Sequence, residues 1–360
     1  MIANRMADLR GMKAVILVGG PGTRLQPLTD NRPKSMVPVL NSPIMEHTLA
    51  YLKQFGIEDI ILTLSYLPDV IQDYFGDGSR CGVHLTYCLE KEPRGTAGAV
   101  KNAEAYLDSS FFVLNGDVFT DMDLADMLAF HRKKEAMATI SLTWVDNPSA
   151  FGVVETDVNQ RVKRFIEKPP LMEATTNWIN AGTYILEPEV LKHMPANRHY
   201  MFENGLFPHL LSVGAPVSGY PYRGYWLDMG TLEKYFSLNT DLLLSRISSP
   251  LIHDFKKGGV NHGPGVNIHP SAVLTPPVMI DSGCLIGRGV HVKGPAVMGR
   301  DCRLEDGASV ENVIMWDDVS IGANSRLTRC IVGSNTVIGN NQNVENQVIT
   351  PSQNVPLSRQ

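Results

Sequence analysis

A run of glycines followed by two cations is the first feature of this sequence with evident chemistry. An apolar run at 14–18 leads into Gly19–Arg24, whose sequence is GGPGTR, and Lys34 follows ten residues later. Glycines let backbone N–H groups approach phosphate oxygens closely, and the arginine and lysine side chains offset the phosphate charge. These residue types at this spacing predict a cradle for a polyphosphate at the end of a buried strand.

The loop differs from the two commonest phosphate-binding glycine motifs. A P-loop ends in Gly-Lys-Ser or Gly-Lys-Thr, whereas Gly22 is followed by Thr23 and Arg24. A dinucleotide fingerprint needs a third glycine, and Leu25 occupies that place. An ordinary glycine-rich turn is the alternative interpretation, although a turn requires neither Arg24 nor Lys34.

Two single aspartates occur beside apolar segments farther along the chain. Asp117 comes just after the apolar run 111–114, and Asp228 precedes a predicted helix. A carboxylate at the C-terminal end of a central parallel strand lies where an open α/β sheet has its ligand crevice. We interpret Asp117 as a metal ligand. A helix N-cap is the alternative, and Asp121 and Asp123 fit that role better.

Three further segments place polar residues or glycines in or near predicted elements. Glu167 and Lys168 end a strand-like run, where a solvated ion pair is the alternative to a binding role. Asn180 lies in another strand-like run, just before Gly182. The segment Gly95–Ala99 begins a predicted helix, and its glycines would let a flat ligand such as a nucleobase lie against the backbone. A helix start that merely contains glycine explains this segment equally well.

The elements that must position these residues alternate between strands and helices over the first 245 residues. Apolar runs and periodicity predict strands at 14–18, 60–64, 83–89, 111–114, 138–145 and 178–185, a hairpin over 151–167, and helices at 44–55, 70–75, 95–106 and 232–244. This order predicts an α/β fold with a Rossmann-like, mostly parallel sheet covered by helices on both faces.

Beyond residue 265 the apolar residues recur every six positions instead. Six residues is the length of one side of a triangular parallel β-helix, whose inward residue must be aliphatic on every face. The phase slips by one at Ile321 and again at Val332, and because Trp316 lies at the first slip we expect a bulge or loop there. The in-phase residues are Ile268, Leu274, Ile280, Ile286, Val292, Met298, Leu304 and Val310.

These patterns predict the division of the chain. We expect a first domain over 12–245, a linker over 246–265, a β-helix over 266–340 and a polar tail over 341–360 that is loose or packs on the end of the β-helix. At ~18 residues per turn, the β-helix would have roughly four turns. A chain of this length is expected to form two domains, because single cores rarely exceed ~250–300 residues.

Composition and charge limit the class of protein. Of 360 residues, 43% are hydrophobic and 19% charged, and the net charge of −5 provides no basic field for nucleic acid. No stretch approaches the ~18 uninterrupted apolar residues of a membrane span. Met1–Gly11 lacks the apolar core of a signal peptide, and a start at Met12 would make 1–11 a poorly ordered extension. The five cysteines form no Cys-x-x-Cys pair, which favours reduced thiols in a cytoplasmic protein.

Taken together, these segments resemble the sugar-1-phosphate nucleotidyltransferases, or NDP-sugar pyrophosphorylases. The resemblance covers about 12–245, and the six-residue repeat extends it to about 340. Arg94 is a departure, because many relatives have an apolar residue before Gly-Thr-Ala-Gly. The residues that carry the resemblance are Leu17–Thr29, Pro33–Val39, Gly95–Gly98, Asn115–Asp117, Phe165–Pro169, Asn180–Gly182 and Trp226–Gly230.

The resemblance implies a role for each matching position. The nucleotide-binding residues would be Gly19, Gly20, Gly22, Thr23, Gly95 and Thr96, of which the last two face the nucleobase. The sugar-phosphate-binding residues would be Gly152, Glu167, Lys168 and Asn180. The catalytic cations would be Arg24, Lys34 and Lys168, and the ligands of the Mg²⁺ cofactor would be Asp117 and Asp228.

The implied reaction transfers a nucleotidyl group from an NTP to a sugar 1-phosphate and releases pyrophosphate. The attacking phosphate oxygen is already anionic, so that positioning and charge neutralisation replace a general base. The chain looks most like the mannose-1-phosphate guanylyltransferases with a C-terminal left-handed β-helix, which make GDP-mannose from GTP. Glucose-1-phosphate uridylyl-, thymidylyl- and adenylyltransferases are the alternatives, because they share nearly all the motifs.

Two other classes of function are alternatives. A β-helix with acyltransferase activity would need a catalytic histidine, and His262, His269 and His291 are candidates, although surface or turn positions also account for them. A non-catalytic subunit that binds NDP-sugar is the other alternative, against which the intact Arg24 and Lys34 argue. Family members commonly assemble through such a β-helix, so we expect a homo-oligomer.

Overall fold

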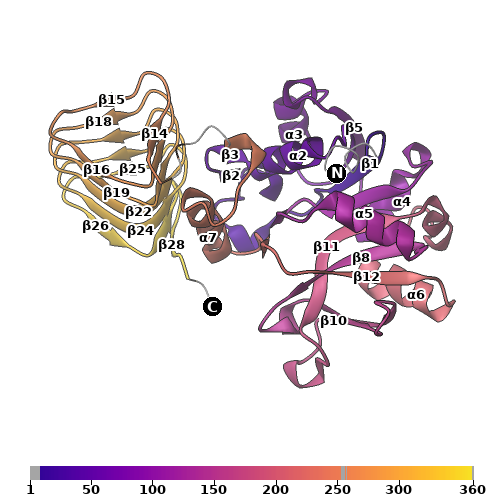
Figure 1. The fold of residues 1–360 in the computed structure, drawn as a ribbon. Helices are drawn as coiled ribbons and strands as arrows, with labels where there is room; N and C mark the ends of the chain where they lie inside the picture. Colours follow the sequence, from indigo (N-terminus) through magenta and orange to yellow (C-terminus); the bar gives the residue numbers. More distant parts are fainter. Residues whose placement is uncertain (1–8, 253–255, 257, 359–360) are drawn as a thin grey trace. The chain divides into compact units, whose positions relative to one another are not determined.

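The computed structural model describes residues 9–252, 256 and 258–358, which form two compact units (Figure 1). Unit 1 extends to Pro21 and continues from Thr48 to Trp226, whereas unit 2 consists of Gly22–His47 and the described residues from Leu227 onward. Of the expected N-terminal extension, residues 1–8 lie outside the described part of the chain. The segment 22–47 groups with the C-terminal half, although we expected it to belong to an unbroken domain over 12–245.

Unit 1 is built on a sheet that has nine strands within the described residues and a parallel centre. Its main path is β10 (Val162–Glu167), β9 (Gly152–Thr156), β11 (Trp178–Leu186), β6 (Phe111–Asn115), β1 (Lys13–Leu17), β4 (Asp59–Leu64) and β5 (His84–Leu89). The strands β6, β1, β4 and β5 are parallel, and β11 runs antiparallel to β6 and β8 (Ala138–Trp144). A final strand, β12 (Val217–Tyr222), is parallel to β8. The predicted α/β fold is confirmed.

Helices follow the parallel strands, as the sequence pattern predicts (Figure 1). These are α2 (Ile44–Gln54), α3 (Pro68–Phe75) and α4 (Gly95–Asn102), which come after β1, β4 and β5 in the chain. Two further helices, α5 (Leu124–Lys133) and α6 (Phe207–Ser212), follow other segments and were not predicted from the sequence. The predicted helix 95–106 is divided, because α4 ends at Asn102 and a 3₁₀ turn covers Glu104–Tyr106. Asp123 is the N-cap of α5, and its carboxylate accepts hydrogen bonds from two backbone N–H groups. None of the helices in the described residues has the length and apolar character needed to cross a membrane.

The carboxyl ends of the parallel strands meet at one edge of the sheet. Leu17 is in register with Thr63 and with Asn115, and Thr63 is in register with Cys88. The segments that leave these strands therefore emerge next to one another, at the edge where open α/β sheets bind ligands. The central strands have near-continuous apolar sequences because both faces of the parallel sheet are buried.

Unit 2 contains a parallel β-helix with three stacked sides (Figure 1). The first side is β15 (Asn267–Ile268), β18 (Leu285–Ile286), β21 (Arg303–Leu304), β23 (Ser320–Ile321) and β25 (Val337–Ile338). The second is β16 (Val273–Thr275), β19 (His291–Lys293), β22 (Ser309–Met315), β24 (Arg326–Val332) and β26 (Asn343–Glu345). The third is β14 (Val260–His262), β17 (Val278–Ile280), β20 (Ala296–Met298), the ends of β22 and β24, and β27 (Gln347–Ile349), with β28 (Asn354–Pro356) antiparallel to it.

The β-helix extends beyond the predicted 266–340 in both directions. Strand β14 lies inside the predicted linker 246–265, and β26, β27 and β28 lie inside the predicted tail 341–360. A coil needs only one aliphatic inward residue on each side, so a polar segment continues the repeat when it supplies these few residues. Ile349 does so, because it joins the interior cluster of buried side chains.

The phase slip arises at a corner rather than from a bulge at Trp316. Paired inward residues are 18 apart in the first coils, as for Ile280 and Met298, and 17 apart from Met298 to Met315 and onward. The missing residue is at the corner between the second and third sides. There Asn312 has a left-handed backbone with φ of +53°, which makes the turn with one residue fewer.

The third side of the β-helix is apolar on its outer surface as well. Val297, Ile314, Ile331 and Val348 alternate with inward residues, so they point outward, yet all four are buried. Helix α7 (Leu232–Leu243) packs beside β20, and the hairpin of β2 (Pro38–Val39) and β3 (Ser42–Pro43) packs beside α7. This apolar outer side explains why the segment 22–47 belongs to unit 2.

Candidate active site

The first glycines of the predicted cradle lie in unit 1, just after β1. The Ser65 hydroxyl donates a 2.7 Å hydrogen bond to the carbonyl of Gly19, and a Cβ on Gly19 would lie 2.8 Å from that hydroxyl oxygen. A Cβ on Gly20 would meet nothing within 4 Å. Gly19 is therefore required by packing, whereas Gly20 leaves open space beside the backbone, as a ligand-facing position should.

The rest of the predicted cradle lies in unit 2, where Gly22 is in close contact with Thr29 and Lys34. Gly22 has φ of +66°, and a Cβ there would lie 2.9 Å from the Cβ of Lys34. The Thr29 hydroxyl donates to the carbonyl of Gly22 at 2.9 Å. A 3₁₀ turn over Thr23–Leu25 follows Gly22, and a second 3₁₀ turn begins at Lys34. The structure thus brings together the glycine and the lysine that the sequence predicted to share one site.

Three cationic side chains converge around Asp228 in unit 2. Its Oδ1 lies 3.7 Å from Nζ of Lys34, and its Oδ2 lies 3.8 Å from Nζ of Lys234. A Cβ on Gly230 would lie 3.0 Å from both an Nη of Arg24 and Oδ2 of Asp228, which places the Arg24 guanidinium beside the carboxylate. The predicted residues Arg24, Lys34 and Asp228 are therefore neighbours.

Three of the predicted sugar-phosphate residues lie together in unit 1. Gly152 is in register with Glu167, and a Cβ on Gly152 would lie 2.9 Å from a carboxylate oxygen of Glu167. Lys168 has φ of +47°, donates its backbone N–H to the carbonyl of Phe151 and places Nζ 3.3 Å from Glu167. The Lys168 side chain is 65% exposed, so its amine remains accessible to an anion.

Tyr184 connects the predicted residues of unit 1. The Asn180 amide donates to the Tyr184 hydroxyl at 2.8 Å, and Asn180 also accepts from the backbone N–H of Gly182. Burial raises the pKa of Tyr184, and the carboxylates of Glu203, Glu167 and Asp117 act in the same direction. Glu167, Asn180 and Asp117 therefore all lie within electrostatic or hydrogen-bonding range of one buried phenol.

The glycines of Gly95–Gly98 are explained by contacts within the protein. Gly95 has φ of +73°, and a Cβ there would lie 2.8 Å from the carbonyl of Tyr200. A Cβ on Gly98 would lie 2.8 Å from the carbonyl of Arg198. Close packing against 198–201 thus accounts for both glycines. This agrees with the alternative that the segment is a helix start that merely contains glycine, and it does not test a nucleobase-binding role. The side chain of Arg94, which departs from the family pattern, donates to Asn197 at 3.0 Å.

Glu203 is a site residue that the sequence analysis missed. The Thr96 hydroxyl donates to its carboxylate at 3.1 Å and accepts from the backbone N–H of Phe202 at 2.8 Å. Burial raises the pKa of Glu203, and the nearby Glu167 raises it further. Glu203 links the segment predicted to face the nucleobase with the one predicted to hold the sugar phosphate. Its sequence surroundings, FENGLFP, contain no glycine loop or strand end that would have singled it out.

Glu90 is a second missed carboxylate, at the carboxyl end of β5. One of its oxygens accepts a 3.2 Å hydrogen bond from the backbone N–H of Arg94, directly before Gly95. The other oxygen is buried and has no hydrogen-bond partner among the described residues. Burial raises the pKa of Glu90. A buried acceptor without a donor costs free energy, so a donor brought to this oxygen would stabilise the carboxylate.

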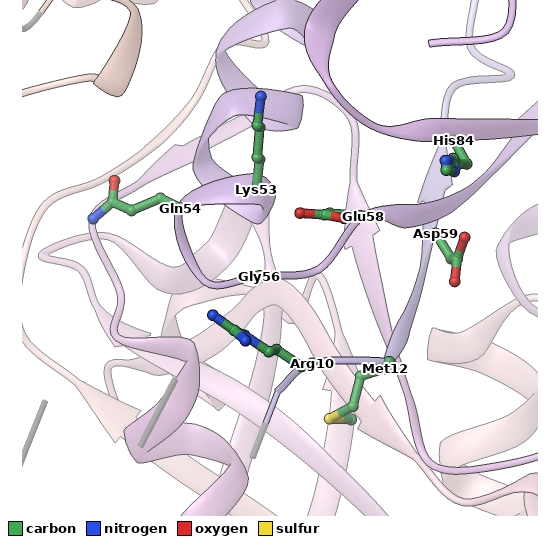
Figure 2. Close-up of a pocket in the computed structure, with 9 residues that line it drawn as sticks. Arg10, Met12, Lys53, Gln54, Gly56, Glu58, Asp59 and His84 are labelled. Carbon is green, nitrogen blue, oxygen red and sulfur yellow. The ribbon is translucent and has the colours of Figure 1, made fainter. Parts of the chain in front are cut away.

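A depression of about 490 Å³ lies at the opposite edge of the sheet (Figure 2). Its lining includes Met12, Asp59 and His84, which precede or begin β1, β4 and β5. Figure 2 shows the mixed charges of its side chains, with Lys53 and Glu58 among them. Because it lies at the amino ends of the strands, this depression is distinct from the ligand edge.

The three histidines considered for acyl transfer are all exposed on the β-helix. Nδ1 of His262 lies 3.2 Å from the carbonyl of Gly263, and Nδ1 of His269 lies 2.9 Å from the hydroxyl of Ser271. His291 begins β19. These are the contacts of turn and surface residues, so they give no specific support to a second activity.

Comparisons with known proteins find similarity over both parts of the chain. A family model described as Nucleotidyl transferase matches residues 13–245, and one described as EIF2B subunit epsilon LbH domain matches residues 257–359. A mannose-1-phosphate guanylyltransferase of Mycobacterium tuberculosis is 39% identical over 83% of this chain and 82% of its own length. A UTP–glucose-1-phosphate uridylyltransferase of Synechocystis sp. is 34% identical over 89% and 87%. The crystal structure of HddC from Yersinia pseudotuberculosis complexed with GMP-PN has a TM-score of 0.56 and 30% identity, over 63% of this chain and 98% of that one.

Proposed function

The chain belongs to the nucleotidyl transferase family, and from that premise we propose that it transfers GMP from GTP to mannose 1-phosphate, which gives GDP-mannose and pyrophosphate. Its class is that of the sugar-1-phosphate nucleotidyltransferases, with a C-terminal LbH domain. The choice of substrate pair needs its own argument, because the similar proteins include both a guanylyltransferase and a uridylyltransferase.

The observation that supports GTP is the buried, unpartnered oxygen of Glu90 beside the Gly95 segment. Guanine carries a ring N–H and an exocyclic amino group next to each other, and a carboxylate accepts both. Uracil and thymine present one N–H between two carbonyl oxygens, which a carboxylate repels. A site built to pair with a donor strongly rejects a base that lacks it. Glu90 therefore favours a guanine nucleotide.

The charged residues of each unit suit one of the two anionic substrates. In unit 2, Arg24 and Lys34 beside Gly22 would bind the phosphates of the NTP. In unit 1, Lys168 would bind the phosphate of the sugar 1-phosphate. Glu167 would accept hydrogen bonds from sugar hydroxyls, and Asn180 would accept from them or donate to them. The sugar-phosphate oxygen attacks the α-phosphorus and pyrophosphate leaves, so the protein contributes position and positive charge.

Nucleotidyltransferases of this family generally use a divalent metal, and we propose Mg²⁺, with Asp117 and Asp228 as its protein ligands. The donor set fits, because Mg²⁺ prefers carboxylate oxygens and is usually held by one or two carboxylates together with substrate phosphates and water. No group of three or more metal-binding side chains occurs among the described residues, which suits that mode of binding. When bound, the metal would neutralise phosphate charge during the transfer.

We also propose that the protein forms a homo-oligomer through its β-helix and acts in the cytoplasm. The exposed sides of a solenoid offer surface for self-association. All five cysteines are free thiols in the structure, which suits a reducing compartment. Sedimentation at micromolar concentration tests the first point, and a monomer would contradict it.

A substrate matrix tests the proposed function. GTP, UTP, dTTP and ATP are each combined with mannose 1-phosphate and glucose 1-phosphate in the presence of Mg²⁺, and pyrophosphate release is measured. We expect the highest kcat/KM for GTP with mannose 1-phosphate. A preference for UTP with glucose 1-phosphate would contradict the substrate pair but leave the enzyme class intact. Tight NDP-sugar binding without turnover in any combination would instead support a regulatory subunit.

A further inference from the structure

Arg32 lies two residues before Lys34 and is held against the β-helix. Its guanidinium carbon is 4.5 Å from the centre of the Trp316 ring. Its Nε is buried without a hydrogen-bond partner among the described residues, so part of the guanidinium has exchanged water for the aromatic face. A cation above an aromatic ring is attracted to the ring face in particular, so this contact fixes the orientation of Arg32.

Trp316 is itself held in place from two sides. Its ring N–H donates to the Tyr235 hydroxyl at 2.8 Å, and that hydroxyl donates to the carbonyl of Pro38 at 2.7 Å. Its backbone N–H donates to the carbonyl of Val332 on the next coil at 2.9 Å. Only 5% of Trp316 is exposed. The ring is therefore a rigid support that the β-helix presents to the segment 22–47.

Two further hydrogen bonds tie the same segment to the β-helix. The amide of Gln353 donates to a carboxylate oxygen of Asp30 at 3.2 Å. The amide of Asn41 donates to the carbonyl of Met298 at 2.9 Å. Asp30 precedes Arg32 and Asn41 follows Lys34, so the attachment points lie on both sides of Lys34 in the sequence.

We propose that Arg32 and Trp316 are positioning residues for the transfer reaction, through which the β-helix fixes the place of Lys34. The proposal rests on the proposed function, in which Lys34 binds phosphate. Pro33 is buried between Arg32 and Lys34 with φ of −61°, and its ring prevents rotation about its own N–Cα bond. A displacement of Arg32 is therefore passed on to Lys34. In an active site, misplacement by about 1 Å can lower the rate about a hundredfold.

The competing role for this contact is simple attachment of the β-helix, and Arg329 offers a matched control. Its guanidinium lies 5.4 Å from the centre of the Phe236 ring and also pairs with Glu233. Phe236 and Glu233 both belong to α7. Arg329 thus makes a cation–aromatic contact between the β-helix and its neighbour, like Arg32, but with α7 instead of the segment that carries Lys34.

The test compares Arg32→Ala, Trp316→Ala and Arg329→Ala in the full chain by pyrophosphate release from the best substrate pair. We expect kcat to fall at least tenfold in the first two variants and to change less than twofold in Arg329→Ala. Trp316→Phe, which keeps an aromatic face, should recover most of the loss. Circular dichroism and thermal unfolding establish that each variant folds. Arg32→Gln and Trp316→Leu, which remove the cation or the aromatic face but keep more of the side-chain volume, replace an alanine variant that does not fold, and the same loss of at least tenfold is expected of them.

A double-mutant cycle separates positioning from attachment. If Arg32 acts through Lys34, Arg32→Ala should lower the residual kcat of Lys34→Ala less than twofold. Equal losses in Arg32→Ala and Arg329→Ala, or fully independent effects of Arg32→Ala and Lys34→Ala, would overturn the positioning role. If the wild-type protein turns over and Arg32→Ala is equally active, the positioning role is overturned but the proposed function stands. A wild-type protein that releases no pyrophosphate with any NTP overturns the proposed function and the positioning role with it.

Discussion

Lys34 places its amine 3.7 Å from Oδ1 of Asp228, and the two side chains are only 11% and 17% exposed. Lys234 approaches the other oxygen of the same carboxylate to 3.8 Å. A carboxylate between two lysines holds both cations near one point before a phosphate arrives. Such preorganised charge stabilises a transition state without reorganisation at the moment of reaction.

Asp228→Asn should lower kcat drastically while the protein stays folded, because asparagine keeps the shape but removes the charge that holds the two lysines and would bind the metal. Loss of one such electrostatic contact typically costs about 10²–10³ in kcat. Asp117→Asn should have a similar effect. Steady-state pyrophosphate release measures both, and Asp306→Asn, on an exposed ion pair of the β-helix, is the control. Near-normal turnover in either active-site variant would disprove its metal assignment.

Glu90→Gln should reduce the preference for GTP, because glutamine replaces one acceptor oxygen by a donor that faces the donors of guanine. A hydrogen bond to a charged group contributes about 1.5–3 kcal/mol. We therefore expect kcat/KM for GTP to fall about tenfold to a hundredfold, with a smaller change for UTP. Glu92→Gln, at an exposed position in the same loop, is the matched control. Equal losses with both nucleotides would argue against base reading by Glu90.

Local patterns predicted the fold because each of its elements leaves a periodic signature in the sequence. Residues 14–17 of β1 are all apolar because a covered parallel strand has no solvent side. Aliphatic residues such as Ile286 and Val310 recur at a fixed spacing because each side of a coil turns one residue inward. The limits of the β-helix were missed for the same reason. The segment 341–360 is polar outside and supplies only a few inward residues such as Ile349, too few to make a visible period.

Residues whose roles depend on tertiary contacts could not be found in this way. Lys234 and Glu203 belong to the site only because folding brings them to Asp228 and Thr96. The glycine signal at Gly95 was ambiguous for a related reason. A glycine shows that something approaches the backbone closely, and here the segment 198–201 already accounts for both glycines, so they do not by themselves indicate a ligand.

Gly22→Ala and Gly20→Ala should separate a structural glycine from a ligand-facing one. Gly22 has a positive φ and lies against Lys34, so alanine there should destabilise the protein by about 1–2 kcal/mol and lower activity. Alanine at Gly20 has room, so stability should stay unchanged while KM for the NTP rises. Thermal unfolding and steady-state kinetics of both variants give the comparison. A destabilised Gly20→Ala, or one with unchanged KM, would count against a phosphate-facing Gly20.

His47 is a buried side chain of unit 2 whose two ring nitrogens both have partners. Its Nε2 lies 2.9 Å from the carbonyl of Val39 and must carry the proton, so Nδ1 accepts from the Ser249 hydroxyl at 2.7 Å. Burial lowers the pKa of His47 to about 4 from the usual 6.5, although the hydrogen bond to Val39 opposes the shift. Between these two values the unfolded chain binds a proton that the folded chain does not bind.

Above about pH 6.5, His47 is neutral in both the folded and the unfolded chain, and the protein has its full stability. As the pH falls from there to about 4, protonation of His47 in the unfolded chain should lower the free energy of unfolding by about 3 kcal/mol. Urea unfolding of the wild-type protein and of His47→Asn from pH 7.5 to pH 4.5 measures this loss. The variant should have a shallower dependence on pH, with part of the slope retained because burial also lowers the pKa of His131. Identical slopes in the two proteins would show that His47 is not the group that binds the proton.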